Sequence, residues 1–279
     1  MGKLFLGTCS WNYDSWEGLV YSKKCRSAAE YLIEYSQHFD TVEIDSWFYK
    51  IPSSKDVIDY KNCTSPGFHF TCKAPEQISL THKRNYKKSE ELISNPDFLS
   101  YDLFCTFIEA IEPLLPQIDC IMLEFKYLNQ LKMVSLNAFL DVLGSFISRI
   151  HNMNIPIGIE TRNKNYLGND YFSFLNERSL IPVFSEKQYM PHVYDVYNQH
   201  SDLINTNVVI RLLGGDRKEI EQKTNQQWNK IVEEKNDKSL IAQMAGDIIG
   251  KGMNCIINVN NHFEGSAPLT IQAIRSFFV

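Results

Sequence analysis

The chain has 279 residues and a formal net charge of −5, and 44% of its residues are hydrophobic. This length and apolar content allow a full-sized core, either in two average domains or in one large α/β barrel. The acidic balance argues against a protein that coats nucleic acid by bulk electrostatics. No segment approaches the ~18 apolar residues of a membrane span, and the apolar run in MGKLFLGTCSW is too short for a signal peptide. We therefore expect a cytoplasmic protein with no membrane partner.

The seven cysteines are odd in number and include no C-x-x-C pair. Several of them lie in segments that have the apolar pattern of strands or helices. This arrangement predicts reduced, mostly buried thiols rather than disulfides or a zinc site.

Short apolar or β-branched runs recur along the chain. Eight are present, at residues 4–10, 41–45, 68–74, 120–125, 155–160, 181–186, 208–214 and 255–261. Runs this short and apolar are typical of parallel strands that are covered on both faces. Helix-like periods lie between them, for example at 27–39, 136–151 and 225–235.

Alternation of strand and helix predicts right-handed βαβ units and a parallel sheet. Eight units in a chain of this length favour a closed (β/α)8 TIM barrel over an open sheet, which would leave two edges. The sequence has no Pro/Gly/Ser-rich linker and no obvious repeat, so we expect residues 1–279 to form one α/β domain. The longest irregular segment, residues 73–98, follows the third strand, and loops of this length are usually functional or mobile.

Charged or amide side chains stand at the carboxyl end of almost every predicted strand. In chain order these ends carry Ser10 and Trp11, Glu43 and Asp45, Lys73, Glu124 and Lys126, Glu160 and Arg162, Glu186, Arg211, and Asn258, Asn260 and His262. In a TIM barrel the active site lies at the carboxyl ends of the strands. The alternative is an ion-pair network that closes the barrel mouth, formed by Glu43, Glu160, Lys73 and Arg211. Because buried charges are costly to desolvate, their clustering favours a ligand site over a purely stabilising role.

This ring of charges supports several kinds of chemistry. Glu43 and Glu160 are candidates for general acid and base, with Lys73 or Arg211 lowering one pKa while burial raises the other. Lys73 is also a candidate Schiff-base nucleophile. A metal site would draw on His82, His262, Glu43 and Glu160. No H-x-H or H-E-x-x-H spacing accompanies these residues, so we expect neither a metal nor a cofactor.

The segment RLLGGDRKE places Gly214 and Gly215 between the seventh strand and a helix. In TIM barrels the loops after strands seven and eight frequently bind phosphate through backbone N–H groups. Together with Gly265, the two glycines would form such a cradle. A plain strand exit explains the same pattern.

Aromatic residues crowd the loops after the first two strands. They are Trp11, Tyr13, Trp16, Trp47, Phe48 and Tyr49. Core packing beneath long loops explains them, and the alternative is a stacking platform for a sugar or a base. The basic segment THKRNYKK, which contains His82, Lys83, Arg84, Lys87 and Lys88, would extend such a platform into a pocket for a flipped base.

The stretch VNNHFEGSAP, residues 259–268, combines two roles. Asn260 and His262 come directly off the eighth strand and are predicted to form a wall of the site. Ser266, Ala267 and Pro268 have the chemistry of a helix start.

Six ordered segments together resemble the YecE-like family (DUF72), a barrel family of unknown function. They are GTCSWNYDSWEGLVY, TVEIDSWFYKIP, FTCKAPEQISLTH, GIETRNKNY, VVIRLLG and NNHFEGSAP, and they extend from Gly7 to Pro268. The resemblance implies a cytoplasmic (β/α)8 barrel with a cleft lined by Trp11, Tyr13, Trp16, Glu43, Tyr49, Lys73, His82, Glu160, Arg162, Arg211, Asn260, Asn261 and His262. The family's fold is similar to the xylose-isomerase and endonuclease barrels, and nucleic-acid binding has been suggested on that analogy.

The chain also departs from the pattern of this family. Cys9 and Ser10 replace the usual Ser-Gly, Asp45 stands for an Asn, Trp47 for a Thr and Leu213 for the His of RLHG, and LEFKY at 123–127 takes the place of fQLPP. The missing His beside Arg211 and the bulk of Trp47 argue against a substrate shared with the family.

The leading hypothesis is an enzyme-like barrel, a hydrolase or lyase, that binds a small anionic or phosphorylated ligand at the carboxyl face. Its residues are Arg211, Arg162 and Lys73 for charge neutralisation, Glu43 or Glu160 for proton transfer, and Asn260 and His262 for orientation of the ligand. The alternatives are a nucleic-acid-binding barrel that uses the aromatic residues and the basic loop, and a ligand sensor without chemistry. No oligomeric state follows from the sequence.

Overall fold

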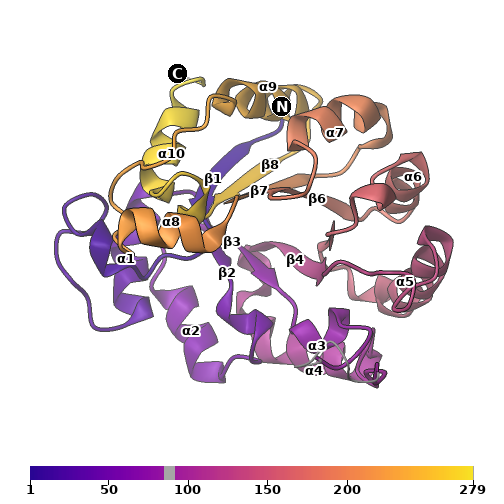
Figure 1. Ribbon diagram of the computed structural model, residues 1–279. Coiled ribbons are helices and arrows are strands. Elements are labelled where there is room, and N and C mark those ends of the chain that lie inside the picture. The colour runs from indigo at the N-terminus through magenta and orange to yellow at the C-terminus, as the bar shows by residue number, and fades with distance from the viewer. Residues whose placement is uncertain (85–91, 279) are drawn as a thin grey trace.

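The computed structural model describes residues 1–84 and 92–278, and its centre is a closed barrel of parallel strands (Figure 1). The strands are β1 (Leu4–Thr8), β2 (Thr41–Ile44), β3 (His69–Lys73), β4 (Ile118–Phe125), β5 (Ile157–Thr161), β6 (Ile181–Lys187), β7 (Val208–Gly214) and β8 (Cys255–Val259). They follow one another around the barrel in sequence order, and β8 closes it by pairing with β1. The predicted (β/α)8 TIM barrel is therefore confirmed, with a strand in each of the eight predicted runs.

Helices surround the barrel on its outside (Figure 1). In the described residues they are α1 (Ala28–His38), α2 (Ser54–Asn62), α3 (Glu76–Ser79), α4 (Tyr101–Ile111), α5 (Leu136–Ile150), α6 (Asn169–Glu177), α7 (Val193–His200), α8 (Arg217–Thr224), α9 (Lys238–Gly250) and α10 (Ala267–Arg275). The predicted helices at 27–39 and 136–151 are confirmed as α1 and α5. Each begins after a serine whose hydroxyl accepts a backbone N–H of the first turn, Ser27 from Glu30 and Ser135 from Ala138.

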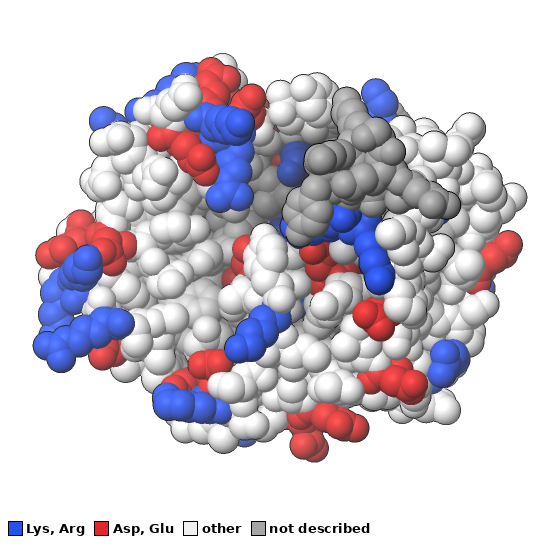
Figure 2. All heavy atoms as spheres, turned by 60° about the horizontal axis from the view of Figure 1, so that its bottom comes forward, with Lys and Arg blue, Asp and Glu red and all other residues white. Residues whose placement is uncertain are grey.

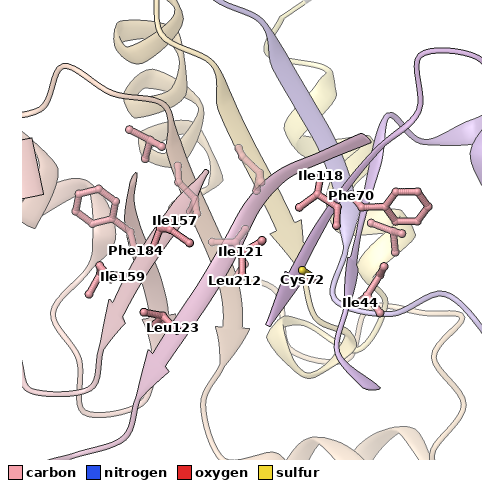
Figure 3. Close-up of a cluster of buried hydrophobic side chains, with 14 of the residues drawn as sticks. Ile44, Phe70, Cys72, Ile118, Ile121, Leu123, Ile157, Ile159, Phe184 and Leu212 are labelled. Carbon is pink, nitrogen blue, oxygen red and sulfur yellow. The ribbon is translucent and has the colours of Figure 1, made fainter. Parts of the chain in front are cut away.

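Side chains of successive strand residues alternate between the helix layer and the barrel interior. Outward-facing residues such as Ile121, Leu123 and Leu212 belong to the large buried cluster between strands and helices (Figure 3). A second, smaller cluster fills the amino-terminal part of the barrel interior, and consists of Phe5, Cys120, Met122, Ile181, Val183, Val209 and Ile256. The bottom of the barrel is thus sealed by apolar side chains.

The interior becomes polar one layer nearer the carboxyl ends. Thr71 on β3 donates to the side-chain oxygen of Asn258 on β8 at 3.4 Å, and the amide of Asn258 donates to the carbonyl of Thr8 at 3.4 Å. Glu43 pairs in register with Thr71 and Arg211 with Asn258, and Lys73, Glu124 and Glu160 occupy further inward positions towards the carboxyl ends. The alternation along each strand therefore delivers the charged strand ends to the barrel mouth.

The helix predicted at 225–235 is wrong. Helix α8 ends at Thr224, and Asn225 adopts a left-handed conformation with φ of 49° that stops it. The chain then follows the loop after β8, where the backbone N–H groups of Val232 and Glu233 donate to the carbonyl of Glu264 at 2.8 and 3.2 Å. Hydrogen bonds to the loop after β8, rather than the helical periodicity of the sequence, determine the conformation of this segment.

Of the long segment predicted to be irregular, residues 73–98, the structure describes both ends. It contains the short helix α3, and an isolated bridge joins His82 to Ser94. Lys87 and Lys88 lie outside the described residues.

Residues 1–84 and 92–278 include no helix long and apolar enough to cross a bilayer. All seven cysteines are free, and four of them are buried, in agreement with the expected thiols.

Candidate functional site at the barrel mouth

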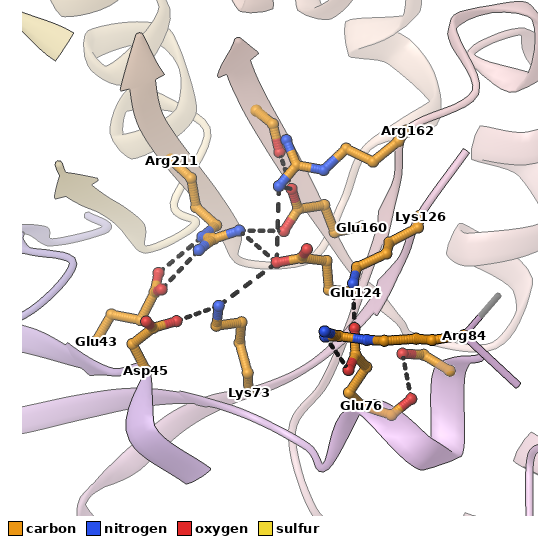
Figure 4. Close-up of polar contacts among 12 residues, drawn as sticks. Glu43, Asp45, Lys73, Glu76, Arg84, Glu124, Lys126, Glu160, Arg162 and Arg211 are labelled. Carbon is orange, nitrogen blue, oxygen red and sulfur yellow. Dashed lines mark hydrogen bonds and ion pairs between the residues drawn. The ribbon is translucent and has the colours of Figure 1, made fainter. Parts of the chain in front are cut away.

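Arg211 on β7 lies at the centre of a buried charge network (Figure 4). Its side chain is only 3% exposed. The guanidinium donates to both carboxylate oxygens of Glu43 on β2, at 2.7 and 2.6 Å. Its third nitrogen donates to Glu160 on β5 at 2.5 Å and to Glu124 on β4 at 3.1 Å. One arginine thus joins four strands across the barrel.

Two further cations complete this network. Lys73 pairs with Asp45, lies 3.6 Å from Glu124, and its amine sits 4.5 Å from the centre of the Phe48 ring. Arg162 pairs with Glu160 at 2.6 Å, and the hydroxyl of Ser185 donates to the same carboxylate. The network predicted from Glu43, Glu160, Lys73 and Arg211 is therefore present, and it extends to Asp45, Glu124 and Arg162.

The pKa values in the network are set by burial and by opposite charges. Burial raises the pKa of Glu43 despite the pull of Arg211. Burial acts on Glu124 in the same sense, but Arg211, Lys73 and Arg162 together lower its pKa to about 2. For Lys73, the lowering by burial and by Arg211 is outweighed by Glu43, Glu124 and Asp45, so that its pKa is raised. At neutral pH Glu124 and Lys73 both carry their charge.

A cleft of about 460 Å³ opens beside the network, over the carboxyl ends of β4, β5 and β6. It is lined by Glu124, Lys126, Tyr127, Arg162, Lys164, Lys187, Gln188, Tyr189 and Met190. Lys126 is paired with Glu76, whereas Lys164 and Lys187 make no ion pair within residues 1–84 and 92–278. Figure 2 shows basic and acidic side chains interspersed on the molecular face in view.

Two cationic side chains that line this cleft are incompletely paired, although Arg162 keeps its ion pair with Glu160. Burial, and next Arg162, lowers the pKa of the Lys187 amine. One terminal nitrogen of Arg162 is buried and has no hydrogen-bond partner in the described part of the chain. Buried donors are normally satisfied, so such atoms mark a place where a ligand or water completes the bonding.

The predicted aromatic residues are divided between core and surface. Trp11 and Trp16 are buried, and the indole N–H of Trp11 donates to the carbonyl of Ala28 at 2.7 Å. Tyr13 is half-buried, and burial raises its pKa to about 12, whereas Tyr49 is 68% exposed. Core packing explains the tryptophans, so that a stacking platform would depend on the two tyrosines.

The predicted polar residues of the eighth loop lie apart from the network. His262 bonds with Asn260 at 2.6 Å and with Glu221 of α8 at 3.1 Å, and Trp228 packs on its ring. Burial lowers the pKa of His262. The side-chain oxygen of Asn261 accepts the N–H of Ala267 at 2.9 Å, so this residue caps α10. The predicted helix start at 266–268 is confirmed, although the capping bond comes from Asn261.

His82 bonds to the hydroxyl of Thr81 at 3.0 Å at the edge of the segment 85–91. Gly214 and Gly265 both have positive φ, and a Cβ on either would overlap neighbouring backbone. Close packing of the backbone thus requires glycine at these two positions. This requirement is independent of the phosphate cradle predicted from the sequence.

Sequence reasoning did not single out Lys187 or Glu124 as site residues. Glu124 was recognised as a strand end, and Lys187 lies one residue beyond the predicted sixth strand. The signal that identifies both is the alternation along the strand, because Glu124 follows the inward-facing Cys120 and Met122 by steps of two. By the same alternation, the inward-facing residues of β6 are Val183, Ser185 and Lys187.

Residues 5–278 match the model of a family described as "Protein of unknown function DUF72". A crystal structure of a DUF72 family protein from Thermotoga maritima is similar, with a TM-score of 0.68, 15% sequence identity and 99% of each chain covered. A DUF72 family protein from Enterococcus faecalis gives a TM-score of 0.65 at 15% identity, with 100% of this chain and 98% of that chain covered. At these identities the likeness shows the fold alone. No curated protein matches the chain.

Proposed function

Because the chain belongs to the DUF72 family, for which no function is described, we propose its function from the geometry of the barrel mouth. The protein binds a small anionic or phosphorylated ligand in the cleft over β4, β5 and β6. The proposal rests on one observation: two residues that line this cleft have unsatisfied donors. The Lys187 amine makes no ion pair within the described residues, and one terminal nitrogen of Arg162 has no hydrogen bond, while its other terminal nitrogen pairs with Glu160.

The charge balance of the described mouth supports an anion. The network and the cleft carry the cations Lys73, Arg84, Lys126, Arg162, Lys164, Lys187 and Arg211 and the carboxylates Glu43, Asp45, Glu76, Glu124 and Glu160. Cations outnumber carboxylates by two, in a chain whose overall charge is negative. A phosphate or carboxylate group in the cleft would restore neutrality and would raise the pKa of Lys187 towards its usual value.

The rim of the cleft fits an organic anion rather than a bare ion. Tyr127 and Tyr189 line it and are 63% and 83% exposed. Tyr189 also has a positive φ of 70°, a conformation that bulky residues rarely adopt and that occurs preferentially at functional sites. Exposed aromatic rings beside cations are suited to the apolar face of a sugar or a base.

Any proton transfer to such a ligand falls to the groups that face the cleft. Glu124 and Lys187 line it, and a lysine with a lowered pKa is better matched to acid and base catalysis near neutral pH. Glu43 and Glu160 are fully buried against Arg211 and would act by holding that arginine in place. In this proposal Lys187 is the general acid or base, and Glu124 stabilises its charged form.

Binding is tested by calorimetry with inorganic phosphate, a pentose phosphate and a nucleoside monophosphate. We expect the wild-type protein to bind at least one of them, and Lys187→Met to weaken that binding about tenfold or more, which is ~1.4 kcal/mol. Lys3→Met is the matched control, because Lys3 is exposed just before β1 at the opposite end of the barrel. Equal affinity in wild-type protein and Lys187→Met, or no binding of any of the three, would overturn the proposal.

Two further measurements separate the alternatives. An enzyme should release phosphate from a bound phosphorylated probe, and Glu124→Gln should then lower turnover more than affinity. Binding without release would favour a sensor. Binding of single-stranded DNA that weakens steeply with salt would favour the nucleic-acid alternative, since that dependence follows from counterion release.

A further inference from the structure

A second cluster of polar side chains lies at the carboxyl face, outside the Arg211 network. It consists of Glu186 near the end of β6, His192 directly before α7 and Asp237 directly before α9. One ligand atom from each residue lies within 4.8 Å of the other two. We propose that these three side chains bind a divalent metal ion. The inference does not depend on the proposed anion site.

The distances within the cluster suit a shared ion. The Nδ1 atom of His192 is 2.8 Å from a carboxylate oxygen of Glu186 and 3.8 Å from one of Asp237. A metal bound at about 2.0–2.2 Å by nitrogen and oxygen places neighbouring donor atoms about 3.0–3.5 Å apart. Small rotations of the side chains therefore bring the three donors around one ion.

Contacts with α7 hold two of the three donors in place. The second oxygen of Glu186 accepts the N–H of Val193 at 2.9 Å, at the first turn of α7. The His192 ring stacks on Tyr194, with centroids 5.1 Å apart and an angle of 7° between the planes. Asp237 brings its Oδ2 atom to 3.8 Å from His192, and its Oδ1 atom is buried without a hydrogen-bond partner in the described residues. The carboxylate therefore has spare bonding capacity, which a cation bound beside Oδ2 would use.

The surroundings leave room for further ligands of the ion. The three residues line a cleft of about 250 Å³, together with Lys187, Tyr189, Gly214, Gly215 and Lys235 among others. Three protein ligands and open positions are the pattern of metals that bind water or substrate. One imidazole with two carboxylates suits zinc, manganese or iron(II) better than calcium, which prefers oxygen donors throughout.

The sequence motifs for metal sites did not indicate this cluster. Its ligands come from the end of β6 and from the residues directly before α7 and α9, at positions 186, 192 and 237, so that no short spacing such as H-x-H connects them. The plain alternative is an ion pair. The hydrogen bond that His192 donates to Glu186 raises the pKa of the imidazole, and a protonated imidazole would balance the two carboxylates without a metal.

The test is titration of chelator-treated full-length protein with zinc, manganese and cobalt(II), by calorimetry and by the visible spectrum of bound cobalt. We expect one equivalent to bind at neutral pH, and His192→Ala and Asp237→Asn each to weaken binding tenfold or more. His200→Ala is the matched control, because His200 ends the same helix and bonds to Asn169 instead.

The pH dependence and a second variant make the outcome unambiguous. Affinity should fall as the pH drops, since protons compete for the imidazole of His192. Lys164→Met should retain the metal, because Lys164 lines the anion cleft and not the cleft of the three ligands; this variant separates the two sites. No stoichiometric binding of any of the three ions, or equal binding by wild-type protein and folded His192→Ala, would leave the cluster as an ion pair and would overturn the proposal.

Discussion

Arg211 carries one charge and contacts three carboxylates at the floor of the barrel mouth. A buried ion pair that loses one partner is strongly destabilised, because the remaining charge stays in a medium that solvates it poorly. We expect Arg211→Met to lower the free energy of unfolding by about 3–5 kcal/mol at neutral pH, measured by urea denaturation. Arg275→Met removes a surface pair with Asp40 and should cost less than about 1 kcal/mol.

This loss should also depend on pH. Burial raises the pKa of Glu43 in the folded protein, and Arg211 opposes that rise, so the variant should have a still higher pKa at this position. A carboxyl group with a raised pKa stabilises the fold at low pH and loses that contribution as the pH rises through its folded-state pKa. The deficit of Arg211→Met should therefore shrink in acid. A deficit that stays constant between pH 5 and neutral pH would contradict this role of Glu43.

At the scale of single residues, the sequence predicted the members of the charge network better than the residues that line the cleft. Glu43, Lys73, Glu160 and Arg211 could be recognised because each stands near the end of a predicted strand. Lys187 lies one residue beyond the predicted sixth strand, so the alternation from Val183 through Ser185 stops short of it. In the structure β6 extends to Lys187, which pairs with Gly214 after a shift of register. The exact end of a strand, and with it the last side chain at the mouth, is set by this tertiary pairing.

At the scale of elements, β7 is joined to the loop after β8 by close backbone contact at Gly214. This residue has a φ of 81°, and a Cβ there would overlap the carbonyl group of His262. Gly214→Ala should therefore destabilise the protein by about 2–3 kcal/mol, from backbone strain and from displacement of the loop. Gly215→Ala is the adjacent control, because nothing lies within 4 Å of a Cβ at that position. Thermal denaturation of the two variants compares them directly, and equal midpoints would show that the contact at Gly214 is unimportant.

The same loop explains why one helix prediction was wrong. Segment 225–235 has helical periodicity, but the buried side chain of Glu264 accepts the N–H of Lys235 and the amine of Lys238, both at 2.6 Å. Trp228 meanwhile packs on His262. These contacts come from residues about 30 positions away, so a window on the sequence does not contain them. The strands were predictable because burial on both faces imposes a local apolar run, whichever neighbours provide the cover.

At the scale of the whole molecule, the barrel has two short seams, one between β1 and β2 and the other between β5 and β6. Strand β1 pairs with β8 through five residue pairs, whereas its pairing with β2 has two, Gly7 with Thr41 and Thr8 with Val42. A Cβ at Gly7 would overlap the carbonyl oxygen of Thr41. Substitution of Gly7 should therefore disturb the pairing of β1 with β2, and with it the closure of the barrel, rather than a single helix.

Gly7→Ala provides the test of whether residues 1–279 unfold as one domain. If they do, the variant should accelerate amide hydrogen exchange at Leu123 on β4 as much as at Leu6 on β1, because both then exchange through global opening. Gly246→Ala is the matched control: its Cβ meets nothing within 4 Å inside α9, so the change should stabilise the protein by about 0.5–1 kcal/mol. Faster exchange confined to β1 and β2 would show instead that the two sides of the barrel open independently.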